Sequence, residues 1–350
     1  MQVNDKKSRI KSVDIAKAIG IFLIVLGHVL KSGELRKFIY AFHVPLFFYL
    51  SGICFSTKEN KKFMVNKIKT IYIPYIVLSI ISILIYVFMG KYVSSSINSN
   101  VLDNIIGMMY CNPNMGNMEW NQPLWFLPCL MIQLILINIL ENLIKNKKYK
   151  QKVRCIIVIV LVLCGFILSA YRIYLPFLLE AAMSMTVFTY LGIVVMENKE
   201  YIKKSKIYRY LTNRKYITML IILIILIISY LLSNYNETVS IMHDRYGNYL
   251  IYFIVSIAMI GIIMLISNKI DQIWKKQKII SYIGQNTLII LLLHKFPILF
   301  FQKLCPIIKD VLNKEDTPIN NMLGAIISII VIVMCIFCKY IVDIRRKKIT

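Results

Sequence analysis

The sequence has few charged residues for its length: 17% of the 350 residues are charged, whereas 58% are hydrophobic. Acidic residues are the scarcest, with 17 Asp and Glu against 42 Lys and Arg. A chain with so little charge and so much apolar surface is not typical of water-soluble globular proteins. The composition therefore indicates an integral membrane protein.

The sequence also lacks the signals of a metal site or a removable leader. Its eight cysteines are scattered, and Cys335 and Cys338 have CxxC spacing only within an apolar segment and without a partner pair. This argues against a zinc or redox centre, so we expect no metal. The first apolar segment has no small-residue cleavage site, and we do not expect it to be removed as a signal peptide.

What the chain does have is a series of apolar segments, each near the ~20 residues that cross ~30 Å of hydrocarbon. They lie at about 12–31, 38–55, 71–90, 123–140, 155–171, 174–195, 216–233, 249–267, 281–301 and 321–341. We therefore expect an all-α polytopic protein that crosses the cell membrane with about ten transmembrane helices. The prediction is a single transmembrane domain over 1–350, with short tails at 1–11 and 342–350.

The distribution of basic residues predicts the orientation. If the N-terminus is cytoplasmic, the segments expected inside hold 31 Lys and Arg, and those expected outside hold 9. This bias is a strong positive-inside signal, and it predicts that both termini are cytoplasmic. The basic excess therefore reflects membrane topology and indicates no nucleic-acid partner; membrane lipids are the expected surroundings.

The first apolar segment, from Ser12 to Gly33, carries the ionisable residues Asp14, Lys17 and His28. At about 100° per residue, the step from Lys17 to His28 is three turns plus roughly 20°, so the two share a helical face. An ionisable group at mid-membrane costs at least ~2.5 kcal/mol, and such groups tend to line an interior cavity. This polar face is the first place to expect chemistry.

The predicted topology sorts the polar residues by depth. Those expected toward the outer side are His28, His43, His243, His294, Glu180 and Trp125. Asp14 and Lys17 are expected at the inner end of the first helix. The arrangement predicts a pore with a cationic inner mouth and a titratable group nearer the outside.

Five stretches carry a family resemblance, in this order: DIAKAIGIFLIVLGH (14–28), FHVPLFFYLSG (42–52), PLWFLPCL (123–130), LPFLLEAAMSMTVFTYLG (175–192) and IGQNTLIILLLH (283–294). Together they resemble the acyltransferase family 3 membrane enzymes, especially the fucose 4-O-acetylase-like branch. These enzymes transfer acyl groups, commonly acetyl from acetyl-CoA, to hydroxyls on cell-surface glycans. The resemblance covers essentially the whole chain.

Two positions depart from the family pattern. Lys17 stands where much of the family has arginine, although lysine is similar to the fucose acetylase-like branch; it offers a point charge instead of a bidentate fork. In KKFMVNKIKTIYIPY (61–75), Thr70 occupies a position that is usually basic, which leaves Lys67 and Lys69 to supply charge. No esterase-like second domain is expected after the last helix.

The resemblance implies O-acylation with acyl-CoA as donor and a cell-surface or lipid-linked glycan as acceptor. A neutral histidine, with a reference pKa near ~6.5, suits removal of a proton from the acceptor hydroxyl. We therefore expect His28 to be the general base, oriented or charged by an acid; transient acylation of His28 stays open. The remaining expected roles are Glu180 and Asp14 beside the base, Lys17, Lys67 and Lys69 at the CoA phosphates, and His43, Trp125 and His294 at the acceptor.

Each of these residues also has a structural interpretation. Lys17 can extend to the inner interface, Asp14 can stabilise a helix N-terminus, and Trp125 can belong to an aromatic belt. A different function, a transporter or flippase for a lipid-linked sugar or small anion, also uses intramembrane charges. The two halves of the chain do not mirror one another, which argues against it, and a sensor or scaffold has no supporting motif. The sugar, its hydroxyl, the acyl length and the oligomeric state stay open.

Overall fold

The computed structural model describes residues 9–93, 100–114, 118–273, 278–304 and 317–349, and the regular elements in them are helices. One isolated β-bridge pairs Ser240 with Arg245. Seven helices of the described ranges are long and apolar enough to cross a membrane, or eight if one bent pair counts as a span. The predicted all-α, polytopic membrane fold is confirmed.

The long helices match eight of the predicted segments. They are α1 (Lys11–Val29), α4 (Asn60–Lys67) continuing through the π-helical η1 (Ile68–Tyr72) into α5 (Ile73–Val93), η2 (Glu119–Trp125) continuing into α7 (Phe126–Ile144), α8 (Lys150–Ala170), α13 (Lys215–Tyr235), α14 (Tyr249–Ile273), α19 (Pro318–Ile349), and the bent pair η3/α9 (Pro176–Leu178 and Leu179–Ser184) with α10 (Thr186–Glu197). The bend in that pair is 58°. Because α19 continues to Ile349, most of the predicted C-terminal tail is helical, whereas residues 1–8 lie outside the described ranges.

Two predicted spans are instead chains of short helices. Residues 38–55 contain the end of α2 (Glu34–Tyr40) and all of α3 (His43–Ile53), and residues 281–301 fall in α15 (Lys278–Gln285), α16 (Thr287–Leu293) and α17 (Lys295–Leu304). Pro45 lies in the first turn of α3, where its missing N–H leaves no intrahelical bond unmade. The hydropathy of both stretches fits a span, but the backbone changes direction inside them. Fewer unbroken helices than predicted therefore span the fold.

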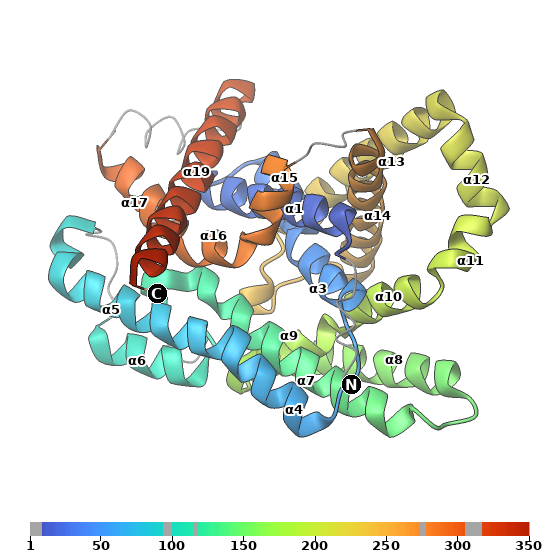
Figure 1. The fold of residues 1–350 in the computed structure, drawn as a ribbon, viewed down its shortest axis with the longest axis horizontal. Coiled ribbons are helices and arrows are strands. Elements are labelled where there is room, and N and C mark those ends of the chain that lie inside the picture. The colour runs from blue at the N-terminus through green and yellow to red at the C-terminus, as the bar shows by residue number, and fades with distance from the viewer. Residues whose placement is uncertain (1–8, 94–99, 115–117, 274–277, 305–316, 350) are drawn as a thin grey trace.

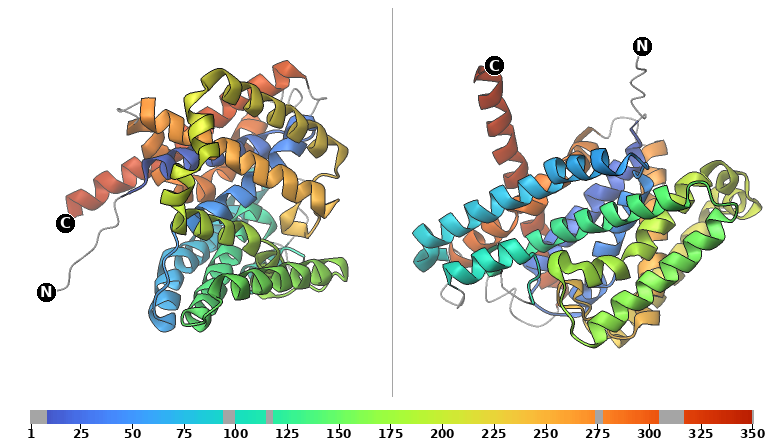
Figure 2. Two further views of the ribbon diagram at one scale, coloured as in Figure 1. Left: turned by 90° about the vertical axis from the view of Figure 1, so that its right-hand side faces the viewer. Right: turned by 90° about the horizontal axis from the view of Figure 1, so that it is seen from below.

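Four further short helices lie in the connections: α6 (Val101–Tyr110), α11 (Lys199–Lys204), α12 (Lys206–Asn213) and η4 (Ile241–His243). In Figure 1, α11 and α12 extend away from the other helices on one side of the molecule, and α5, α6, α7 and α8 gather along another. Figure 2 shows α5, α7 and α8 running roughly alongside each other. Helices α2, α3, α14, α15, α16 and α19 pack against α1.

Helix α1 is the centre of the packing. Of the apolar 18-residue stretch of α1, 72% is buried inside the protein, whereas 11% to 61% of the corresponding stretch is buried in the other candidate spans. It contacts α14, α15, α19 and α3, and Figure 1 shows it lying among these helices. Small residues such as Ala16, Ala18 and Gly20 let neighbours approach closely, which is how helices pack in lipid. An ionisable side chain on α1 therefore faces protein or an internal cavity.

Helices α3 and α10 touch backbone to backbone. A Cβ added to Gly52 would collide with the carbonyl oxygen of Thr189, and one added to Gly192 would collide with that of Tyr49. The Thr189 hydroxyl also donates to the Phe48 carbonyl at 3.1 Å. This contact anchors α3, which carries His43 and Phe47, to the bent helix pair.

A buried ion cluster joins α7, α8 and α10. The Arg154 side chain is 2% exposed; its Nε and Nη2 each donate to Glu141 at 2.8 Å, and Nη1 donates to Glu197 at 2.7 Å. Planar, bidentate pairing of this kind compensates the cost of burying a guanidinium. The cluster fixes these three helices relative to one another at the end that holds the 141–154 connection.

Candidate active site

Two cavities lie along α1, one at each end. The first, the Lys17 cavity, has a volume of about 370 Å³, and the second, the His28 cavity, about 350 Å³. At about 1.5 Å per residue, the backbones of Lys17 and His28 are about 16 Å apart along the helix. The polar face that the sequence predicts therefore borders two adjoining cavities.

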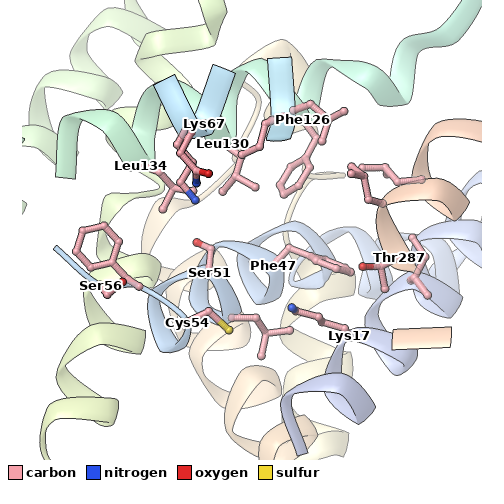
Figure 3. A pocket seen from close by; sticks show the side chains of 18 of the residues that line it. Lys17, Phe47, Ser51, Cys54, Ser56, Lys67, Phe126, Leu130, Leu134 and Thr287 are labelled. Carbon is pink, nitrogen blue, oxygen red and sulfur yellow. The ribbon is translucent and has the colours of Figure 1, made fainter. Parts of the chain in front are cut away.

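The Lys17 cavity is cationic at its polar side and apolar elsewhere. Lys17 comes from α1, Lys58 from the connection after α3, and Lys67 from the end of α4. Figure 3 shows Lys17 and Lys67 reaching toward the cavity from different sides, with Ser51 and Cys54 between them. Lysine ammonium groups above an apolar wall suit a ligand with phosphates and an uncharged arm.

The His28 cavity gathers histidine, aromatic and cationic side chains. Its polar and aromatic lining includes His28, His43, His243, Trp125, Tyr40, Arg36, Lys31 and Gln122. These residues come from α1, the α1–α2 connection, α2, α3, η2 and the segment around η4. The structure thus brings His28, His43 and Trp125 into the lining of one cavity.

His28 lies in the last turn of α1, against a second histidine. The ring centroids of His28 and His294 are 5.2 Å apart, and the Tyr40 ring meets His28 edge-on at 6.3 Å. A smaller cavity of about 140 Å³ is lined by both histidines and by Lys31 and Lys295. The neighbour of His28 is therefore His294, at the start of α17.

The contacts of His294 define its tautomer. Its Nδ1 lies 2.8 Å from the Leu291 carbonyl oxygen and 3.0 Å from that of Ile290. A carbonyl only accepts hydrogen bonds, so Nδ1 carries the proton and Nε2 of the neutral ring carries the lone pair. That Nε2 is buried and has no hydrogen-bond partner among the described residues.

His43 is held in the same way. Its Nδ1 lies 2.8 Å from the Ile39 carbonyl oxygen, and its ring centroid is 4.9 Å from that of Tyr40. Arg36 lies over the Tyr40 ring at 4.2 Å and donates to the Gly27 carbonyl at 3.3 Å. His43, Tyr40 and Arg36 therefore form one packed part of the cavity lining.

Glu180 lies elsewhere. It is fully buried in the first turn of α9; its Oε1 accepts from Asn112 Nδ2 at 2.7 Å, and its Oε2 accepts from the Leu175 N–H at 3.0 Å. It lines neither of the two cavities. These contacts hold the turn before α9, where Phe177 and Leu178 have positive φ. The sequence predicts Glu180 beside His28, but its contacts are with Asn112 and Leu175 instead.

A chain of hydrogen bonds nevertheless joins Glu180 to the His28 cavity. The Asn114 N–H donates to Asn112 Oδ1 at 3.0 Å, and Asn114 Oδ1 lies 3.1 Å from His243 Nδ1. Burial, and then the charge of Arg245, lower the pKa of His243. Next to it, burial and then the Glu180 carboxylate raise the pKa of Asp244 to about 8. Glu180 thus supports the segment that covers this cavity.

Asp14 and Lys69 also lie outside the cavities. Asp14 is buried and accepts from Arg9 Nε at 2.6 Å and from the Ser281 hydroxyl at 3.4 Å. Lys69 is exposed on η1. The contacts of Asp14 favour the structural interpretation, in which it anchors the start of α1.

Sequence reasoning missed several lining residues. Lys58 belongs to no motif, Lys31 lies in the α1–α2 connection, and Arg36 and Tyr40 lie in the short helix α2, which has no motif of its own. Their nearness to an intramembrane histidine in the sequence was the one available signal. Among the described residues, no group of three or more His, Cys, Asp or Glu side chains is arranged to hold a metal ion.

The sequence model of a protein family described as an acyltransferase domain, acyltransferase family 3, matches residues 10–341. The matched range runs from the start of α1 into α19 and includes the residues of both cavities. No curated protein and no solved structure matches the chain.

Proposed function

We propose that this chain, which belongs to acyltransferase family 3, moves an acyl group such as acetyl from cytoplasmic acyl-CoA to a hydroxyl of a cell-surface or lipid-linked glycan. The family membership makes the protein a membrane acyltransferase. The observation that carries the finer proposal is the pair of cavities along α1, cationic at Lys17 and lined by histidines at His28.

In this proposal the Lys17 cavity binds the donor. Lys17, Lys58 and Lys67 hold the CoA phosphates, and the apolar wall beside them accommodates the pantetheine arm. The 31-to-9 bias of Lys and Arg supports placing this end in the cytoplasm, where acyl-CoA is made. Lys69 is exposed outside the cavity and is not part of this proposed donor site.

The His28 cavity would hold the acceptor and the base. The acceptor oxygen attacks the thioester carbonyl carbon while His28 takes the hydroxyl proton. A C–O bond forms, the C–S bond breaks, and the proton leaves with the CoA sulfur as a thiol. The ring contact with His294 supports a positioning role for that residue.

The lining of this cavity supports a sugar acceptor. Trp125 and Tyr40 offer flat aromatic faces, and His43 presents an unprotonated Nε2 that accepts a hydrogen bond from a hydroxyl. Arg36 and Lys31 suit an anionic group on the same acceptor. A lipid-linked or acidic glycan matches these requirements.

The test is acyl transfer from labelled acetyl-CoA to isolated surface polysaccharide by the purified protein. His28→Gln keeps a polar side chain of similar length but removes the base, so turnover should fall by roughly 10² to 10⁴-fold. Binding of acetyl-CoA should be unchanged. Near-normal turnover in folded His28→Gln protein would contradict the assignment.

A transporter is the second candidate, because two cavities at opposite ends of one helix also suit alternating access. The same protein in sealed proteoliposomes separates the two functions. A transporter would move a lipid-linked sugar or anion without consuming thioester, whereas the acyltransferase would release free CoA in step with the ester that it forms.

A further inference from the structure

Four apolar side chains line both cavities. They are Ile24 of α1, Phe47 of α3, Phe126 of α7 and Leu291 of α16. We call this set the apolar partition. It carries no charged or polar side chain, although cations line the cavity on one side of it and histidines line the cavity on the other.

Two aromatic rings form the bulk of the partition. The Phe47 and Phe126 rings meet edge to face, with their centroids 6.1 Å apart and their planes at 72°, and Figure 3 shows both side chains at the cavity. Gly20 lets Phe47 lie close to α1, because a Cβ there would be 2.8 Å from Phe47 Cε2. Phe48 also packs on Phe126, with the two ring centroids 5.3 Å apart, and Phe48 is fully buried.

The partition stands between the proposed donor and the proposed base. Lys17 and His28 lie on opposite sides of it, about 16 Å apart along α1. A thioester held by its phosphates at Lys17 reaches His28 only if its acyl end passes between these side chains. An uncharged acyl group can cross an apolar constriction, whereas phosphates and hydrated ions pay a large desolvation cost.

We propose that Phe47 and Phe126 are the specificity-determining residues for the acyl group, because their edge-to-face contact narrows the passage into the His28 cavity and limits what enters it to short chains such as acetyl. This inference rests on the proposed function and names the feature that selects its donor. The same two rings keep the cavities separate when no donor is bound.

The first test compares donors of different length. The ratio of turnover with butyryl-CoA to turnover with acetyl-CoA, each at saturation, should rise at least tenfold in Phe47→Ala and in Phe126→Ala. Phe47→Leu, which disturbs packing less, should show a smaller rise. The matched control is Phe48→Leu, since Phe48 packs on Phe126 but lines neither cavity, and its ratio should stay that of the unmodified protein.

The second test needs no acyl transfer. Cys54 is exposed and lines the Lys17 cavity, so a membrane-impermeant maleimide should label it only from the Lys17 side of sealed proteoliposomes. In the double variant Phe47→Ala/Phe126→Ala, the reagent should also reach Cys54 from the His28 side, as measured by mass spectrometry of the Cys54 peptide. Cys54→Ser identifies labelling at any other site.

The two tests distinguish failure of the proposed function from failure of the proposal for Phe47 and Phe126. Absence of acyl transfer with every acceptor would overturn the proposed function, and with it the role in acyl selection, whatever the labelling of Cys54 shows. If the protein transfers acetyl but the folded variants keep both the donor ratio and one-sided labelling, the proposal for Phe47 and Phe126 is overturned. A raised ratio in Phe48→Leu as large as in Phe47→Leu would overturn it as well.

Discussion

At the scale of single residues, the two ends of α1 carry different chemistry on one helical face. Lys17 is accompanied by two further lysines. His28 is accompanied by a second histidine, whose unprotonated Nε2 has no hydrogen-bond partner in the part of the chain that the structure describes. In the proposed function, the charge of Lys17 serves donor binding and His28 serves proton transfer. Substitutions at the two ends should therefore change different kinetic constants.

Lys17→Ala should raise the KM for acetyl-CoA roughly tenfold while lowering kcat less, because it removes binding that the ground state and transition state share. Lys17→Arg should retain activity, since the charge remains. Steady-state kinetics with varied acetyl-CoA measures both constants. The control is Lys69→Ala, an exposed lysine outside the cavity, which should leave KM nearly unchanged. Normal donor binding without turnover in Lys17→Ala would place Lys17 in the chemical step.

Asp244 should make stability depend on pH. Its carboxylate oxygens accept no hydrogen bond from the described residues, and its pKa rises from 3.8 to about 8 through burial and the charge of Glu180. The folded state then holds a proton that the unfolded state releases, so stability falls as pH rises through this window, by up to about 1.4 kcal/mol per pH unit. Thermal unfolding in detergent between pH 5 and 9 measures the slope.

Asp244→Asn is the matched variant, because it keeps the shape of the side chain and cannot ionise. The pH dependence of its melting temperature should be flatter, and at pH 9 it should be at least as stable as the unmodified protein. An equally steep slope in Asp244→Asn would assign the titration to another group.

At the scale of helices, breaks bring the functional side chains into the cavities. Helix α3 begins at His43 after the chain turns, α16 ends next to His294, and η2 continues into α7 at Trp125 and Phe126. Residues at these helix boundaries contribute to the lining of each cavity. Irregular backbone at membrane depth is tolerated only where protein or a water-filled cavity surrounds it, which is the position of these breaks.

The Arg154 cluster should be the strongest polar tie between helices. Arg154→Ala leaves Glu141, which is 3% exposed, without its main partner, and should cost about 3–5 kcal/mol of stability. The measurement is thermal unfolding of the purified protein. Lys203→Ala breaks an exposed pair with Glu200 on α11 and, as a control, should cost less than about 0.5 kcal/mol. Combining Arg154→Met with Glu141→Gln should recover part of the loss.

At the scale of the whole molecule, hydrogen bonds join connections that the charge bias assigns to the same side of the membrane. Asn142 Nδ2 donates to the Lys58 carbonyl at 2.8 Å, and Arg154 pairs with Glu197, so three segments predicted inside meet one another. On the other side, Asn114 Nδ2 donates to the Met242 carbonyl at 3.2 Å. Each set of contacts thus joins connections that are predicted to lie on the same side of the membrane.

Cysteine substitutions near residues 62, 147 and 204 should be labelled from the cytoplasmic side, and those near 113 and 240 from the outside. The physical reason is retention of Lys- and Arg-rich connections in the cytoplasm. Labelling of intact cells with an impermeant reagent, before and after permeabilisation, is the measurement. Labelling of position 62 in intact cells would reverse the orientation and remove the cytoplasmic donor from the Lys17 cavity.

The sequence by itself determined the helical membrane fold and most of the long helices. It also determined that Lys17 and His28 lie on one face of α1, toward opposite ends of the helix. Hydropathy and the 3.6-residue period act within one segment, so they can be seen without knowing what the segment packs against. The cost of burying an ionisable group likewise indicated an internal cavity beside α1.

Only the tertiary structure decided which polar groups meet. Glu180 contacts Asn112, His28 contacts His294, and the two cavities are separated by side chains from four helices. The sequence also could not show that 38–55 and 281–301 bend, because their hydropathy matches that of straight spans. Such pairings depend on helix packing between residues up to hundreds of positions apart, and no local pattern encodes that distance.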